Sequence, residues 1–198
     1  MMSRTTRVAA AAALVLAVSS SRLGAQQRAA PFESITLGLS VVRNVGRNSF
    51  HEQWSPGTGL GVRAEMPFYA GVAEAGVEQL GFRSRTASVP GFTGRYYFVG
   101  WGMELAPASR LVLSPAFRFG NYAMRFDDPV LPEERRHESE IALELVSRAS
   151  WRAGAGWRTT LSGHYRVVLT EPRIRHLNFT AGVARTFKTP AWLREFLD

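Results

Sequence analysis

Ten titratable residues of this chain fall at alternate positions within otherwise apolar or small-residue runs, and they carry charges of both signs. They are Arg63, Glu65, Glu74, Glu78, Glu104, Arg118, Glu144, Arg148, His164 and Arg166. Charged groups persist inside a protein only when they are paired and hydrogen-bonded. We therefore predict that these residues form an internal ion-pair network. A gated polar path through the interior is the alternative use of the same residues.

His164 and Ser162 lie two positions apart, which places them on one face of an extended strand. This pair has the residue types of a nucleophile and its base, and Glu144 could orient the imidazole. Both side chains are predicted to point into a packed interior, where no lipid or polymer substrate reaches them. We therefore predict no catalytic residues, with hydrolysis as the alternative.

The other histidines, His51, His137 and His176, are scattered without the spacing of metal ligands. The chain has no cysteine, which excludes disulfide bonds and thiolate metal sites. We predict neither a metal site nor a cofactor.

Eight runs of alternating apolar and polar residues must position these groups, and each has the two-residue period of a β-strand. The runs cover residues 34–41, 58–68, 72–82, 96–105, 111–119, 139–151, 159–169 and 177–187. Two places fit poorly. The phase fails near Gln79 and Leu80, which predicts a β-bulge. Pro115 stands in the middle of its run, where proline is disfavoured.

The connections between the runs alternate between two classes. Those at 69–71, 106–110 and 154–157 are tight, whereas those at 47–57, 83–94, 127–138 and 170–175 are long, polar and contain proline. Short turns at one end and long loops at the other are typical of membrane barrels. The chain is therefore predicted to be all-β: an eight-stranded antiparallel, up-and-down transmembrane barrel.

The chemistry of the two strand faces decides which one meets lipid. Placing seven of the charged residues on the lipid face would cost on the order of 10 kcal/mol or more, because an arginine at the bilayer midplane alone costs about 2–4 kcal/mol. The apolar faces are therefore predicted to point outward. A soluble ligand-carrying barrel, the alternative, has its apolar residues inside.

Aromatic residues gather at the outward ends of the strands and in the tight turns. They are Phe68, Tyr69, Trp101, Trp151, Trp157, Tyr165 and Phe187. Such rings are typical of the interface between membrane and water, so we predict an aromatic girdle.

The long loops are rich in arginine, and the chain has a formal net charge of +8. The loop arginines are Arg47, Arg83, Arg85, Arg95, Arg135, Arg136, Arg173 and Arg175. At an outer rim they could bind the phosphates of lipopolysaccharide, or they could be ordinary solubilising charge. Because an exported barrel meets no nucleic acid, we do not expect a nucleic-acid partner.

The two ends differ from the barrel region of 34–187. Residues 1–25 combine Arg4, Arg7 and an apolar stretch, as in a cleaved signal peptide. Residues 26–33 are expected to form a periplasmic lead. Residues 188–198 are expected to form a short amphipathic helical tail, lying on the inner leaflet or under the barrel mouth.

Over residues 34–187 the chain resembles the small outer-membrane barrels of the OmpA/OmpX type. Its strand count, its charged interior and its last strand, which ends in Phe187, carry the likeness. The resemblance implies a bacterial outer-membrane location, membrane lipids and lipopolysaccharide as partners, and a C-terminal strand recognised by the barrel-assembly machinery.

The same resemblance includes barrels that modify lipid A, and some of those carry a His-x-Ser arrangement. Neither His164 nor His176 is followed by serine two positions later. The function predicted from the sequence is therefore a non-enzymatic barrel with a plugged, salt-bridged lumen, acting in envelope integrity or through its surface loops on an unidentified partner. A lipid A-modifying acyl hydrolase or transferase, or a narrow channel, is the alternative.

Overall fold

The computed structural model describes residues 31–197 other than 88, 129 and 131, so the expected signal peptide lies outside the described residues. Its strands are β1 (Ser34–Asn44), β2 (Trp54–Pro56), β3 (Thr58–Phe68), β4 (Gly71–Ser84), β5 (Phe92–Gly102), β6 (Leu111–Phe126), β7 (His137–Gly154), β8 (Trp157–Val168) and β9 (Ile174–Lys188). Its helical elements are α2 (Phe50–Gln53), the single turn η1 (Glu133–Arg136) and α3 (Ala191–Leu197).

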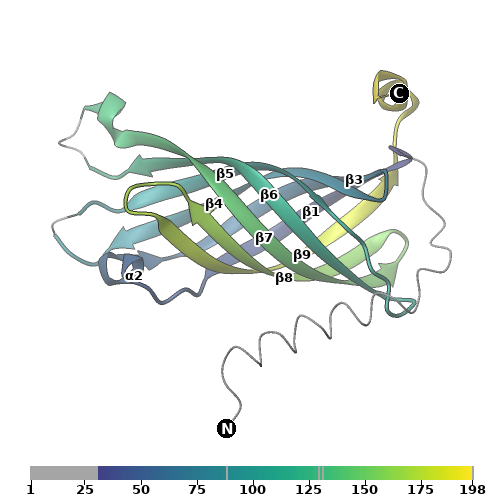
Figure 1. Ribbon diagram of the computed structural model, residues 1–198, viewed down its shortest axis with the longest axis horizontal. Coiled ribbons are helices and arrows are strands. Elements are labelled where there is room, and N and C mark those ends of the chain that lie inside the picture. The colour runs from purple at the N-terminus through teal and green to yellow at the C-terminus, as the bar shows by residue number, and fades with distance from the viewer. Residues whose placement is uncertain (1–30, 88, 129, 131, 198) are drawn as a thin grey trace, which may run out of the picture.

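Antiparallel pairing runs in the order β4-β3-β1-β9-β8-β7-β6-β5, and a β4–β5 pairing closes the ring. The short strand β2 continues the ladder of β3 along β4. This confirms the predicted closed, eight-stranded antiparallel barrel. The long connections and α2 lie at one end, the loop end, while the tight turns and α3 lie at the other, the turn end (Figure 1).

The barrel wall has its apolar side chains outside and its charged side chains inside, which is the opposite of their distribution in a soluble protein. Leu60, Ile141 and Leu145 are each 60 % exposed on the outside, whereas Arg118 and Glu144 are 1 % exposed inside. An apolar outer surface with charges enclosed is stable only where lipid surrounds the barrel. None of the described helices is long and apolar enough to cross a membrane.

The predicted bulge near Gln79 and Leu80 does not lie in β4 itself, whose register with β5 is unbroken through Leu80 and Gly94. On the other side of β4 the register does shift by one residue: Leu60 pairs with Gln79 but Pro56 pairs with Phe82, so the extra residue lies in the segment 57–59 between β2 and β3. Leu80 keeps the inward phase of the strand and is buried. The pattern seemed to fail only because the interior becomes apolar towards the loop end.

The same change in the interior explains why β5 and β6 are longer than predicted. β5 begins at Phe92 rather than at residue 96, and β6 continues to Phe126 rather than ending at 119. The inward positions of these extensions carry buried apolar side chains, among them Tyr122 and Met124. Their outward positions carry polar residues such as Arg95 and Arg125, so the apolar and polar faces exchange sides and the pattern of the rest of each strand does not continue.

Pro115 fits its strand because of where its nitrogen points. Its carbonyl accepts a hydrogen bond from the backbone N–H of Met103, just beyond the end of β5 at Gly102. In an antiparallel strand the nitrogen of a residue points to the same side as its carbonyl. The missing N–H therefore faces Met103 at a gap in the β5–β6 ladder, which resumes in the same register at the Leu105–Leu113 bridge. The β6–β7 register continues through Pro115.

Candidate functional site

The layer of the lumen nearer the turn end brings two carboxylates together. Glu65 and Glu74 lie opposite each other across β3 and β4, where like charges would repel. Arg148 of β7 reaches across the barrel and binds both, through Nη1 to Glu65 and through Nη2 to Glu74 at 2.8 Å. The Nε of Arg63 donates to Glu65 at 2.6 Å from the other side. Each carboxylate thus has more than one guanidinium partner.

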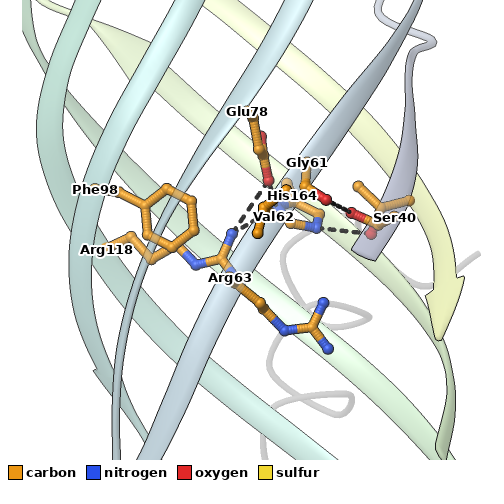
Figure 2. Close-up of a pocket in the computed structure, with 9 residues that line it drawn as sticks. Ser40, Gly61, Val62, Arg63, Glu78, Phe98, Arg118 and His164 are labelled. Carbon is orange, nitrogen blue, oxygen red and sulfur yellow. Dashed lines mark hydrogen bonds and ion pairs between the residues drawn. The ribbon is translucent and has the colours of Figure 1, made fainter. Parts of the chain in front are cut away.

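Arg118 holds the next layer (Figure 2). Arg118 donates two hydrogen bonds to Glu74, from Nε to Oε1 at 2.7 Å and from Nη2 to Oε2 at 3.1 Å. Its Nη1 also donates to Glu144 at 3.2 Å and to Glu78 at 3.4 Å. Its guanidinium carbon lies 4.1 Å from the ring centre of Phe98. Arg118 is therefore the centre of the network, since it contacts three carboxylates and an aromatic face.

Arg166 completes the network towards the loop end. It donates to Glu144 at 2.6 Å and also binds Glu78 through Nη2. Its guanidinium carbon lies 3.9 Å from the ring centre of Tyr96, which caps the charged layer. Because Glu144 lies directly opposite both Arg118 and Arg166 in the strand register, three neighbouring strands carry one continuous row of alternating charge.

The network is balanced in charge. Its four guanidiniums belong to Arg63, Arg118, Arg148 and Arg166, and its four carboxylates to Glu65, Glu74, Glu78 and Glu144. All eight residues are buried. Arginine suits this role because its planar fork binds carboxylates at several points.

Two of the predicted network residues have different surroundings. Glu104 lies apart, at the turn end, where Arg158 donates to it at 2.9 Å and both side chains are partly exposed. His164 is inside the network, with Nδ1 at 3.4 Å from Glu144 and Nε2 at 3.2 Å from the hydroxyl of Thr180. The sequence analysis did not include Arg158, although it has the inward phase of β8.

The Ser162–His164 pair does not form a nucleophile and base. Ser162 is buried, and its hydroxyl has no hydrogen-bond partner among the described residues. Both nitrogens of His164 instead face Glu144 and Thr180. Ser162 is the register partner of Arg148, so its surroundings are those of the ion-pair network.

Glu78, Glu144 and His164 are the group of described residues that could hold a metal ion, with their ligand atoms within 4.8 Å of one another. Arg118 and Arg166 already bind both carboxylates. A divalent cation would have to displace these guanidiniums, so the donor set does not favour a metal.

The aromatic residues proposed for the girdle all face outward. Six of them lie towards the turn end: Phe68, Tyr69, Trp101, Trp151, Trp157 and Phe187. Tyr165 stands apart, opposite Leu145 near the middle of β7. Arg185 lies on the outer face between two of these rings, with its guanidinium carbon 5.3 Å from Trp157 and 5.1 Å from Phe187.

The mouth at the loop end is closed by aromatic side chains that the sequence analysis missed. Phe50 of α2 is buried, and its ring lies 5.3 Å from Phe82 and 5.1 Å from His176, which belong to β4 and β9. The ring of Trp54 stacks on that of Phe50, with 4.9 Å between the ring centres, and its indole N–H donates to the carbonyl of Pro90. Only long-range packing brings these residues together, and their segment has no strand period.

The hydrogen bonds of His51 with Asn44 and Asn48, which form a polar latch, hold α2 against the barrel. Nε2 of His51 donates to Oδ1 of Asn44 at 2.6 Å, and the other nitrogen lies 2.8 Å from Oδ1 of Asn48. Asn44 in turn contacts Nδ1 of His176 at 3.0 Å. Partial burial, and then the nearby charge of Arg85, lower the pKa of His51 below its ordinary 6.5.

The latch is expected to weaken in acid. A lowered pKa in the docked loop means that the released loop binds the proton more tightly, so docking is favoured above pH 6.5 and is lost as the pH falls below it. Between about pH 7.5 and about pH 5, the indole N–H resonance of Trp54 should shift towards its value in a Phe50→Ala variant. His51→Gln should remove the pH dependence. A Trp54 resonance that stays constant over this range would contradict the assignment.

A second group that the sequence analysis overlooked lies on the outer face near the loop end. His137 and Ser139 have His-x-Ser spacing on β7 and share the outward row of Ile141. Nε2 of His137 lies 3.4 Å from Glu133, and Nδ2 of Asn121 donates to the hydroxyl of Ser139 at 2.5 Å. The spacing was visible in the sequence, but it adjoins a run of alternating charges that is typical of solvated surface.

The fold is that of the small eight-stranded outer-membrane barrels. The structure is similar to the crystal structures of Neisserial surface protein A (TM-score 0.58, 11 % identity, covering 78 % of this chain and 96 % of that one) and of the N-terminal barrel domain of Pseudomonas aeruginosa OprF (0.53, 8 %, 79 % and 99 %). It is also similar to the solid-state NMR structure of the outer-membrane protein AlkL (0.51, 11 %, 87 % and 98 %). Neither a model of a known protein family nor a curated protein matches the chain.

This likeness confirms the resemblance to the OmpA/OmpX type at the level of the fold. The barrel has the architecture and the apolar outer wall of proteins that reside in the bacterial outer membrane.

Proposed function

We propose that this chain is a non-enzymatic outer-membrane barrel with a closed lumen, which binds outer-leaflet lipid through an arginine rim and acts through its loop end. The balanced ion-pair network is the observation that carries the proposal. It fills the middle of the barrel with eight paired charged side chains, and the cavity beside Arg118 and His164 has room for about one water molecule.

An ion passing through such a lumen would have to break several buried pairs at once. Removing one partner of a buried pair costs about 3–5 kcal/mol, because the other charge is left without compensation. The aromatic mouth around Phe50 closes the same path at the loop end. Both features favour a barrel that does not conduct.

The rim is defined by five outward-facing arginines near the long loops: Arg43, Arg83, Arg95, Arg125 and Arg175. All are exposed, and no outward strand position among the described residues at this end carries an acid. The phosphates of lipopolysaccharide lie at this level of an outer membrane, and arginine binds phosphate through two parallel hydrogen bonds. Arg43 and Arg125 extend the set of arginines expected from the loops.

Reconstitution into planar bilayers tests the closed lumen. The folded protein, identified by its heat-dependent shift in gel mobility, is expected to give no discrete conductance steps. Replacing both Phe50 and Arg118 by alanine supplies the comparison, because it removes the aromatic mouth and the centre of the network. Conductance steps from the unaltered protein would overturn the proposal in favour of a narrow channel.

The rim is tested by binding to vesicles that contain lipopolysaccharide. Changing the five rim arginines to glutamine should weaken the binding and its dependence on salt, while five matched arginine changes at the turn end, at 110, 152, 158, 185 and 194, should not. Equal loss in the two variants would show only an effect of net charge.

A second candidate function rests on the outer-face group of His137, Ser139, Glu133 and Asn121. Serine, histidine and a carboxylate are the parts of a hydrolytic triad, and an amide N–H can stabilise an oxyanion. The acyl esters of lipid lie at the level of this face, so the chemistry would be hydrolysis of an ester to a carboxylic acid and an alcohol. The test between the two candidate functions is the mass of lipid A from cells that express the protein. A loss of an acyl chain that is abolished by Ser139→Ala, but not by Ser162→Ala, would establish an enzyme.

A further inference from the structure

We propose that the loop-end mouth is a binding site for a small aromatic molecule that carries a hydrogen-bond acceptor, and that Phe50 occupies this site in its absence. This inference goes beyond the proposed function, since a closed lumen and an arginine rim require no ligand in the mouth.

The site is built by the barrel, not by the loop that fills it. The rings of Phe82, Phe92, Tyr122 and His176 come from β4, β5, β6 and β9 and surround the barrel axis. The ring of Phe82 stacks on that of Phe92, with 4.7 Å between the ring centres, and on that of His176, with 5.4 Å between the ring centres. Gly94 leaves room for Tyr122, because a Cβ on this residue would lie 2.1 Å from the tyrosine oxygen. The wall therefore comes from regular strands, and Phe50 approaches Phe82, Phe92 and His176 with ring edge to ring face.

Two buried polar atoms in this region have no hydrogen-bond partner within the part of the chain that the structure describes. They are the hydroxyl of Tyr96, whose residue is fully buried, and Nε2 of His176, which is 1 % exposed. A buried donor without a partner is destabilising, because it has lost its hydrogen bonds to water without replacement, so such groups need an explanation. A ligand with an acceptor atom beside its ring would supply the missing bond.

The hydrogen bonds around Asn44 fix which atom His176 offers. The backbone N–H of Gly46 donates to Oδ1 of Asn44, so the other side-chain atom is the NH₂ donor. This Nδ2 donates to Nδ1 of His176 at 3.0 Å. A neutral imidazole that accepts at Nδ1 carries its hydrogen on Nε2. The free atom in the mouth is therefore an N–H donor, which is why the ligand needs an acceptor.

The segment that carries Phe50 is far less firmly held than the wall. It is a four-residue helix between β1 and the three-residue strand β2, and no side chain caps its first turn. Its attachments are the His51–Asn44 bond, the Trp54–Pro90 bond and a few backbone bonds, including that from Arg85 to Gln53. Segments with few contacts open at low cost, so α2 can leave while the barrel stays intact.

The floor of the site is closed, which makes it a blind pocket. Tyr96 lies on the guanidinium of Arg166, and below it the ion-pair network blocks the lumen. A molecule entering from the loop end therefore binds and leaves by the same opening. Exchange of one ring for another conserves the apolar burial in the mouth, and the new hydrogen bond favours the ligand.

The test uses 4-fluorobenzamide as the probe, observed by fluorine NMR with the full-length protein in lipid nanodiscs. The unaltered protein is expected to bind the probe, and Phe50→Ala to bind it at least tenfold more tightly, because the competing ring is gone. 4-Fluorotoluene, which has the same ring without an acceptor, should bind at least tenfold more weakly than the amide. Phe119→Ala on the lipid-facing wall is the control for partition into lipid.

A disulfide between β2 and β4 tests whether α2 must move. Ser55 and Arg83 are register partners, and the chain has no other cysteine to interfere with Ser55→Cys and Arg83→Cys. Oxidation should abolish binding of the probe, and reduction should restore it. Each variant must first show the heat-dependent mobility shift of the folded barrel.

Equal affinity of the unaltered protein and Phe50→Ala would overturn the inference, as would an equal gain in Phe119→Ala or unchanged binding after oxidation. None of these results bears on the conductance test, so failure here leaves the proposed function standing.

Discussion

Replacing Arg118 by leucine is expected to lower the free energy of unfolding by about 3–5 kcal/mol, the largest effect of any single change in the lumen. The substitution leaves Glu74, Glu78 and Glu144 short of a partner inside the barrel, and the network then carries one uncompensated negative charge. The midpoint of denaturant unfolding in lipid vesicles measures the loss.

A double-mutant cycle separates charge balance from packing. Glu144 is the direct register partner of Arg118, so Glu144→Leu alone should also destabilise, by leaving the positive charge in excess. The combination of Arg118→Leu and Glu144→Leu restores the balance. It should cost less than the sum of the two single changes. Strict additivity would show that the pair does not interact and would contradict the network as described.

Replacing Leu145 by arginine is expected to cost about 2–4 kcal/mol in a bilayer, because the new charge would lie near the middle of the lipid-facing wall. Leu145 is 60 % exposed, lies at the centre of β7 and is flanked outward by Phe117 and Tyr165. In a soluble protein the same change at an exposed position would alter stability by at most about 0.5 kcal/mol. The prediction therefore tests whether lipid surrounds this face.

Leu169 provides the matched control for depth. It is also exposed on the outer wall, but it follows the last residue of β8 at the loop end. Leu169→Arg should cost only about 0–1 kcal/mol, since an arginine at the interface reaches water and phosphate. Refolding into vesicles measures both variants. Equal and small costs at the two positions would show that the apolar belt does not meet acyl chains.

The inward charges show what alternation alone can predict. Arg118, Glu144 and Arg166 keep the phase of their strands, so their inward orientation follows from the sequence. Their partners do not: Arg148 binds Glu65 across 83 positions of the chain. That contact depends on how the ring of strands is staggered when it closes, and no local pattern encodes the stagger.

The loop end shows where alternation fails. Phe92, Tyr122 and Met124 face inward beside charged or polar outward neighbours such as Arg95 and Arg125, so a charge no longer marks the interior. Phe50 belongs to a loop and joins the interior only through tertiary packing. The mouth was missed for this reason, whereas the His137–Ser139 spacing was present and was masked by the charges beside it.

The placement of the lumen charges has a consequence for assembly. In the first half of the sheet, β3 carries one lumen charge of each sign and β4 carries Glu74 and Glu78, so this half has a net of two negative charges. In the second half, Arg118 and Arg166 give β6–β8 a net of two positive charges. Neither half can neutralise itself. Opposite charges on the two halves attract them during biogenesis, and only the fully closed ring, in one register, cancels them. The lumen thus favours completion of the barrel over any partly closed sheet.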